Sequence, residues 1–206
     1  MTKTWMLLAA SLLAGGCLLP SPPEPPRLFA PLVSDAVARP VETTDATAVR
    51  VAPVRSPLYL REQMAWRLSE VEIGLYDQRR WTELPSTYVE RSLGRELGGL
   101  EHPRTLTDVP VVSAEVRAFE EVLAPVHEAR VEVAIEVADA RCVLLQQGFA
   151  ATRPLAGDDP AAVARGIGEA LDEVTTAAGK EIRRALEHRG HCTDDGSRPS
   201  GRAKAP

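Results

Sequence analysis

Apolar and polar residues alternate along five short segments of the chain. The clearest lies between Ala129 and Val137, where Val131, Val133 and Ile135 alternate with charged or small residues. A period of two places successive side chains on opposite faces of a strand, so one face is covered and the other is wet. The pattern predicts a mainly antiparallel sheet with strands near 48–52, 71–75, 112–118, 129–137 and 142–149. The last two are expected to pair across the turn at residues 138–140.

Two other segments repeat their apolar residues every three or four positions, which is typical of amphipathic helices. The first spans 86–97, with Val89, Leu93 and Leu97 on one stripe and two glycines after it. The second is capped by Asp158 or Asp159, has Pro160 in its first turn, and ends near residue 190. Its apolar face consists of Val163, Ile167, Leu171, Val174, Ala178, Ile182 and Leu186. These elements predict an α+β fold in which two main helices pack on one face of a mainly antiparallel sheet.

The first 16 residues have the pattern of a bacterial lipoprotein signal peptide. Lys3 precedes an apolar run from Trp5 to Leu13, which is too short for a bilayer core that needs about 20 residues. Small residues at 14–16 then lead directly to Cys17. We therefore expect cleavage before Cys17 and lipid on its thiol. The alternative is an ordinary secretory signal that happens to precede a cysteine.

Residues 17–46 are expected to be the lipidated cysteine and a proline-rich tether. The prolines at 20–26 favour an extended chain, which acts either as a spacer of set length or as a linker with no length requirement. A domain is expected over 47–190 and a disordered tail over 191–206. Leu18 stands where an aspartate is the usual inner-membrane retention signal. Its identity favours the outer membrane, on the periplasmic face.

Length and charge limit the function further. Removal of residues 1–16 leaves 206 − 16 = 190 residues, enough for one domain, and loss of Lys3 changes the net charge from −5 to −6. An acidic chain has no electrostatic footprint for nucleic acid. In an oxidising compartment Cys142 and Cys192 are able to pair. The alternative is one buried and one exposed thiol.

No catalytic constellation is evident along the sequence. His188, His191 and Cys192 are possible metal ligands, but a solvated helix end is the preferred interpretation. Asp158 and Asp159 are possible acid–base carboxylates, but helix capping explains them. The chain has no phosphate-binding glycine loop and no G-x-S-x-G motif. We therefore predict no catalytic residues, no cofactor and no metal.

Several short motifs follow the cysteine in a distinctive order. They are Val51–Val54, Pro57–Arg61, Met64–Arg67, Arg80–Pro85 and Val116–Glu120, followed by a long closing helix. In this order the chain resembles the ABC-type transport auxiliary lipoproteins, the PqiC-like group, over about residues 46–189. Arg61 departs from that pattern, in which an acidic residue or asparagine is commoner.

The resemblance implies a non-catalytic accessory lipoprotein that partners an MCE-domain protein and ABC transporter components. Such systems move lipids or other hydrophobic molecules between the membranes. Tyr59, Arg61 and Trp66 are the candidate partner-binding residues, because aromatic side chains and arginine are enriched at interface hot spots. Self-association through a sheet edge is also plausible. The alternative function is a stand-alone envelope scaffold that binds another periplasmic protein.

Trp81 has two interpretations. As a core residue it would anchor the first helix, and this interpretation is preferred. As a surface residue it would join Tyr59 in a partner-facing patch.

Overall fold

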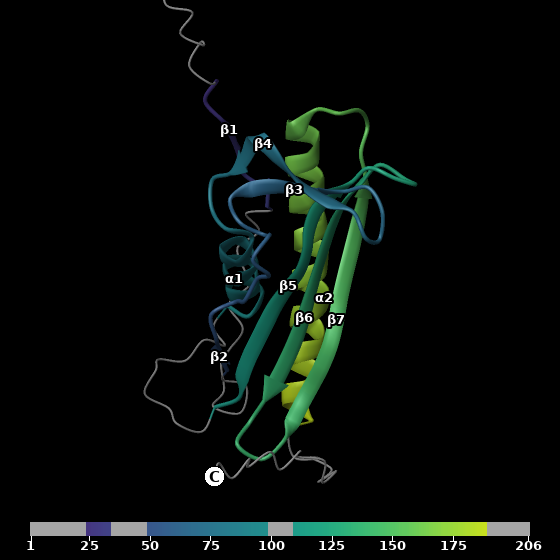
Figure 1. The fold of residues 1–206 in the computed structure, drawn as a ribbon. Helices are drawn as coiled ribbons and strands as arrows, with labels where there is room; N and C mark the ends of the chain where they lie inside the picture. The colour runs from purple at the N-terminus through teal and green to yellow at the C-terminus, as the bar shows by residue number, and fades with distance from the viewer. Residues whose placement is uncertain (1–23, 34–48, 99–108, 189–206) are drawn as a thin grey trace, which may run out of the picture.

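The computed structural model describes residues 24–33, 49–98 and 109–188, which form an α+β fold (Figure 1). The predicted fold class is thereby confirmed. Cys17, the signal peptide, the prolines at 20–23 and the C-terminal tail lie outside the described residues. In chain order the elements are β1 (Arg27–Phe29), β2 (Arg50–Val51), β3 (Gln63–Arg67), β4 (Ile73–Trp81), α1 (Pro85–Glu96), β5 (Val111–Val122), β6 (Glu128–Ala138), β7 (Val143–Pro154) and α2 (Pro160–Glu187).

The seven strands of the described chain form one mixed sheet in the order β1-β4-β3-β5-β6-β7, with β2 beside β5. The long strands β5, β6 and β7 form an antiparallel meander. The pairing of β6 with β7 across the turn at 138–140 agrees with the sequence prediction. β3 and β4 form a second antiparallel hairpin. Three contacts are parallel, however, because β1 joins β4 and both β2 and β3 join β5.

Helix α2 covers the rear of the three long strands in the view of Figure 1. Asp159 is its N-cap, since its carboxylate accepts a hydrogen bond from the Ala161 amide at 3.0 Å. The predicted apolar face is buried against inward side chains of β6, such as Val131 and Ile135. This burial supplies the main driving force for packing helix on sheet.

Helix α1 extends the same layer beside α2. The Arg183 guanidinium donates a hydrogen bond to the Glu96 carbonyl at 2.9 Å, and Thr176 donates to the Glu96 carboxylate at 3.0 Å. Under α1 lies an aromatic cluster in which Trp81 and Phe119 meet edge-on, with ring centroids 5.3 Å apart. Trp81 is only 3 % exposed. It is therefore a core residue, and its surface interpretation is wrong.

The N-terminal segment 24–33 lies within the range assigned to the tether, yet it contacts the folded domain. β1 pairs with the end of β4, so that Phe29 stands opposite Trp81. The backbone of Leu32 then passes so close to α2 that a Cβ on Gly168 would lie 2.1 Å from the Leu32 carbonyl oxygen. A strand of three residues is too short to show the alternation from which it could be predicted.

Candidate partner-binding surface

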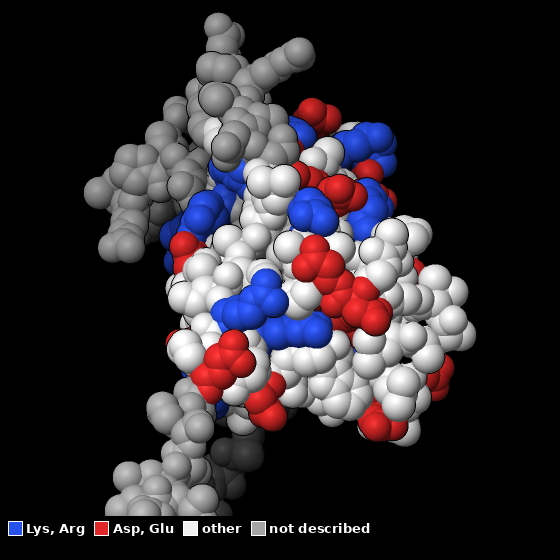
Figure 2. Space-filling model, turned by 90° about the horizontal axis from the view of Figure 1, so that it is seen from above, with Lys and Arg blue, Asp and Glu red and all other residues white. Residues whose placement is uncertain are grey.

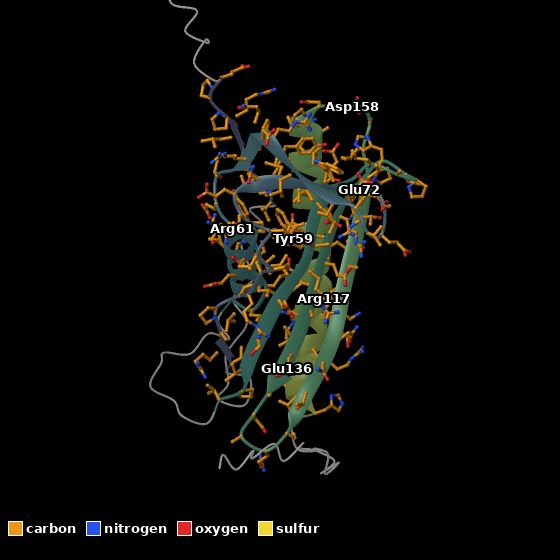
Figure 3. All side chains as sticks on the ribbon, viewed as in Figure 1. Tyr59, Arg61, Glu72, Arg117, Glu136 and Asp158 are labelled. Carbon is orange, nitrogen blue, oxygen red and sulfur yellow. The ribbon has the colours of Figure 1, made fainter. Side chains whose placement is uncertain are left out.

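The face of β5, β6 and β7 away from α2 presents a polar surface to solvent. Outward positions along it include Glu115 and Arg117 on β5 and Glu136 on β6; Figure 3 labels Arg117 and Glu136 on this side. A shallow groove of about 560 Å³ follows these positions. Small residues form part of its wall, notably Ala134 and its register partner Gly148. The groove therefore offers mixed charge without an apolar floor.

The connection from β2 to β3 folds against the upper part of this face. The Tyr59 hydroxyl donates a hydrogen bond to the Arg117 carbonyl at 3.1 Å, and the Arg61 Nε donates to the Leu58 carbonyl at 2.9 Å. Burial raises the pKa of the Tyr59 phenol, and the nearby Glu120 carboxylate raises it further. Tyr59 thus fixes the connection to β5, while Leu58 remains 81 % exposed at its tip.

A second hollow, of about 540 Å³, opens where this connection meets the start of α1. Its apolar wall consists of Pro57, Leu58, Leu60 and Leu84. Arg61 and Arg80 supply positive charge, and Glu62, whose carboxylate lies 3.7 Å from the Arg80 Nη1, supplies a negative one. The Ser56 hydroxyl and the Arg80 Nε in this wall are buried without a hydrogen-bond partner among the described residues. The hollow therefore combines apolar surface with unused donors, which suits a side chain or short segment of a partner. We call it the loop hollow.

Trp66 does not share this surface with Tyr59. Arg67 interacts with Tyr59, and successive residues of a strand point to opposite faces, so Trp66 lies on the other face. There its ring covers Gly74 of β4, where an added Cβ would lie 2.1 Å from the ring. Of the three predicted site residues, the structure therefore places Tyr59 and Arg61 on one connection and Trp66 apart from them.

Two consecutive carboxylates on β5, Glu120 and Glu121, are both buried. Glu120 forms a two-pronged ion pair with Arg67, with the Nε at 2.5 Å and Nη2 at 3.2 Å. Burying a carboxylate is costly unless it is paired and hydrogen-bonded. The pair fastens β3 to β5 on the face that also holds Tyr59.

Glu121 points to the opposite face and has three partners. It accepts a hydrogen bond from the Tyr76 hydroxyl at 2.9 Å, contacts the His127 Nε2 at 2.6 Å, and has Arg79 Nη1 at 3.6 Å. Burial of the phenol raises the pKa of Tyr76 to about 12, and its hydrogen bond to Glu121 adds to this rise. Every member of the cluster already has a partner, so the arrangement favours a structural role over proton transfer.

This carboxylate pair was not predicted from the sequence. A signal was present, because Phe119-Glu120-Glu121 breaks the alternation of β5 just after a shift in its register with β6. A strand covered on both faces at one end accounts for two successive buried charges.

Other chemistry is limited in the part of the chain that the structure describes. No group of three histidine, cysteine, aspartate or glutamate side chains there is placed to hold a metal. Cys142, in the turn before β7, is disulfide-bonded, and the other two cysteines lie outside the described ranges. Among the described helices, neither is both long enough and apolar enough to span a membrane.

Comparison with known proteins establishes the family. Two crystal structures share the fold: a Xanthomonas campestris protein of family model DUF330 (21% identity, TM-score 0.67, 81% of this chain and 100% of that one) and an uncharacterized protein (12% identity, TM-score 0.61, 77% and 99%). No curated protein matches the chain. The model of the ABC-type transport auxiliary lipoprotein component matches residues 32–178. Because this match covers most of the chain, the protein belongs to the ABC-type transport auxiliary lipoprotein family.

Proposed function

We propose that this protein is a non-catalytic accessory lipoprotein of an ABC transport system that contains an MCE-domain protein and moves lipids or other hydrophobic molecules across the envelope. The family match over residues 32–178 carries this proposal. In it, lipid on Cys17 anchors the chain to the periplasmic face of the outer membrane, after removal of the signal peptide. The domain then holds the transport assembly at that membrane.

The connection from β2 to β3 is the proposed docking site for the transport partner. Its tip combines the exposed Leu58 with the Arg61 guanidinium beside the loop hollow. Arginine is enriched at interface hot spots, and the exposed leucine beside it adds apolar area that a partner can bury. Tyr59 positions this tip through its bond to the Arg117 carbonyl. Trp66 is not part of this docking site, because its ring lies on the opposite face of the sheet.

Permanent anchoring allows each contact at this site to be weak. Two proteins held at one membrane meet at a high effective concentration, so modest affinity suffices. A second copy of the chain is a further proposed partner. The long strand β7 lies at the edge of the sheet, and an edge strand is able to pair with its copy.

Site-specific photocrosslinking in intact cells tests the docking site. A photoreactive residue at Leu58 should capture an MCE-domain or permease component, whereas one at Lys180, on the exposed side of α2, should not. Arg61→Glu should weaken capture from position 58 by about tenfold. Loss of a hot-spot residue costs at least about 1.4 kcal/mol of binding free energy, which corresponds to about a tenfold loss of affinity. The matched Lys180→Glu variant should leave it unchanged.

The outcome also separates the two candidate functions. Capture of a periplasmic protein outside any transporter, together with unaltered permeability and lipid distribution in a deletion strain, would favour the stand-alone scaffold. Equal capture from positions 58 and 180 would show that the connection from β2 to β3 is not the docking site. It would leave the family assignment intact.

A further inference from the structure

Two neighbouring loops carry a group of exposed aliphatic side chains. We call this group the tip patch; it consists of Leu68, Val71, Ile73 and Leu75 from the β3–β4 hairpin and of Leu123 and Val126 from the β5–β6 turn. Val71 is 94 % exposed and Val126 is 56 % exposed. The view of this end in Figure 2 shows mostly uncharged side chains over its right-hand side, where Figure 1 places the β5–β6 turn. Grouped apolar exposure of this kind marks an interaction site.

The tip patch is held in a fixed conformation by its own backbone. The Leu68 amide donates a hydrogen bond to the Glu72 carbonyl at 3.0 Å, and the Ser69 hydroxyl accepts from the Glu72 amide at 3.1 Å. The two loops are joined by a bond of 2.8 Å from the Leu123 amide to the Arg67 carbonyl. Because the side chains are presented by ordered turns, contact with a partner would cost little additional ordering.

The tether limits how far this end of the domain can lie from the membrane. Seven residue steps separate Cys17 from Glu24, the first described residue, and a fully extended chain spans about 25 Å over that length. β1 follows at once and pairs with the last residues of β4, Arg79–Trp81. β4 begins at Ile73, within the tip patch, six residues before Arg79. The tether therefore joins the domain about 20 Å along β4 from the patch, a distance similar to its own extended length.

The charges around the patch favour an apolar partner over an anionic one. Glu70 and Glu72 flank Val71, and the nearby Arg67 is already paired with the buried Glu120. No cluster of free cations among the described residues of these two loops offers a site for anionic headgroups. The patch therefore suits a partner with an accessible apolar interior, and the bilayer that holds the lipid on Cys17 is the one within reach of the tether.

We propose that the tip patch inserts its aliphatic side chains into the interface of the bilayer that holds the lipid on Cys17. The inference rests on the proposed lipid anchor but not on the transport partner. Lipid and patch then form two separate attachments, and two attachments fix the tilt of a domain that a single attachment leaves free. The β6–β7 turn, at the far end of the long strands (Figure 1), is thereby directed away from the membrane.

Photolabelling from within the bilayer tests this orientation. The lipidated protein would be reconstituted into phosphatidylethanolamine–phosphatidylglycerol vesicles that contain a phospholipid with a diazirine on its acyl chain, and adducts would be mapped by mass spectrometry. Labels are expected at residues 68–75 and 123–126. Val126→Asp should reduce tip labelling by about fivefold, because it replaces buried apolar area with a charge.

Val143→Asp is the matched control, since Val143 is 55 % exposed but lies at the β6–β7 turn. It should leave tip labelling unchanged, and the melting temperatures of both variants should stay near that of the parent. Equal labelling at both ends, or tip labelling that survives Val126→Asp, would overturn the proposal. So would a dependence on anionic lipid. The intact mass reports lipidation of Cys17 separately, so failure of the anchor is distinguishable from failure of the patch.

Discussion

Among the individual residues, Trp81 has a purely structural role. Its ring packs edge-on against Phe119 and Tyr88 beneath α1. Its indole nitrogen, however, has no hydrogen-bond partner among the described residues. The stabilisation it provides therefore comes from apolar burial and ring packing.

Trp81→Ala is accordingly expected to lower the free energy of unfolding by about 3–5 kcal/mol, because a large aromatic side chain leaves a cavity. Trp81→Phe should cost much less, since it keeps a ring and removes an unpaired donor. Chemical denaturation monitored by circular dichroism measures both. An unaltered stability in Trp81→Ala would contradict its assignment to the core.

Tyr76 should make the protein sensitive to alkali. Its pKa rises from about 10 in the unfolded chain to about 12 in the folded one. Between these values the folded state binds more protons than the unfolded state, so stability falls as the pH rises. The contribution is fully present below about pH 10 and is lost through about pH 12.

Tyr76→Phe should therefore flatten the stability profile over this interval, as measured by urea unfolding at several pH values. Tyr88→Phe serves as the control, because the Tyr88 hydroxyl contacts Thr82 and not Glu121. A profile that stays equally steep in Tyr76→Phe would assign the alkaline loss to another group.

At the scale of elements, the short strand β1 depends on a close approach between two backbones. The Leu32 main chain crosses α2 at Gly168, where a side chain would collide with backbone atoms. Glycine lowers helix propensity by about 1 kcal/mol relative to alanine. The cost is offset by docking of the segment that leads back to the tether.

Gly168→Ala is expected to displace residues 31–33 and loosen β1, which hydrogen–deuterium exchange would detect as faster exchange over 24–33. Gly179→Ala on the same helix is the control, since its added Cβ would be 3.3 Å from the Glu96 Cβ, a contact that a small shift relieves. Equal exchange in the two variants would mean that the close approach does not hold the segment.

At the scale of the whole molecule, attachment to the membrane is predicted to depend on Cys17. Two or three acyl chains bind a bilayer almost irreversibly, whereas a single chain binds only marginally. Cys17→Ser should therefore move the protein from the membrane fraction to the soluble periplasmic fraction, as followed by fractionation and by incorporation of labelled fatty acid. If the wild-type chain takes up no fatty acid, the lipoprotein assignment is wrong.

Local sequence patterns were enough to predict the long elements and the family. They did not predict β1 and β3, and the apolar residues expected on a covered face at 71–75 are exposed, with Val71 at 94 %. The alternation of β5, β6 and β7 and the apolar stripe of α2 follow from residues that are near one another in the chain, because each period reports which face is buried. The motifs between residues 51 and 120 placed the chain in its family, which the match over residues 32–178 confirms. Neither the motifs nor the family match shows which surface a partner contacts.

Which distant residues meet followed from the three-dimensional packing alone. The parallel contacts of β1, β2 and β3 join segments far apart in sequence, and local periodicity carries no information on such pairing. The same holds for Glu120 and Glu121, whose partners lie on β3, on β4 and in the β5–β6 turn. The separation of Trp66 from Tyr59 and the assembly of the tip patch from two hairpins have the same cause: faces and loop neighbours are fixed by strand order, which long-range packing selects.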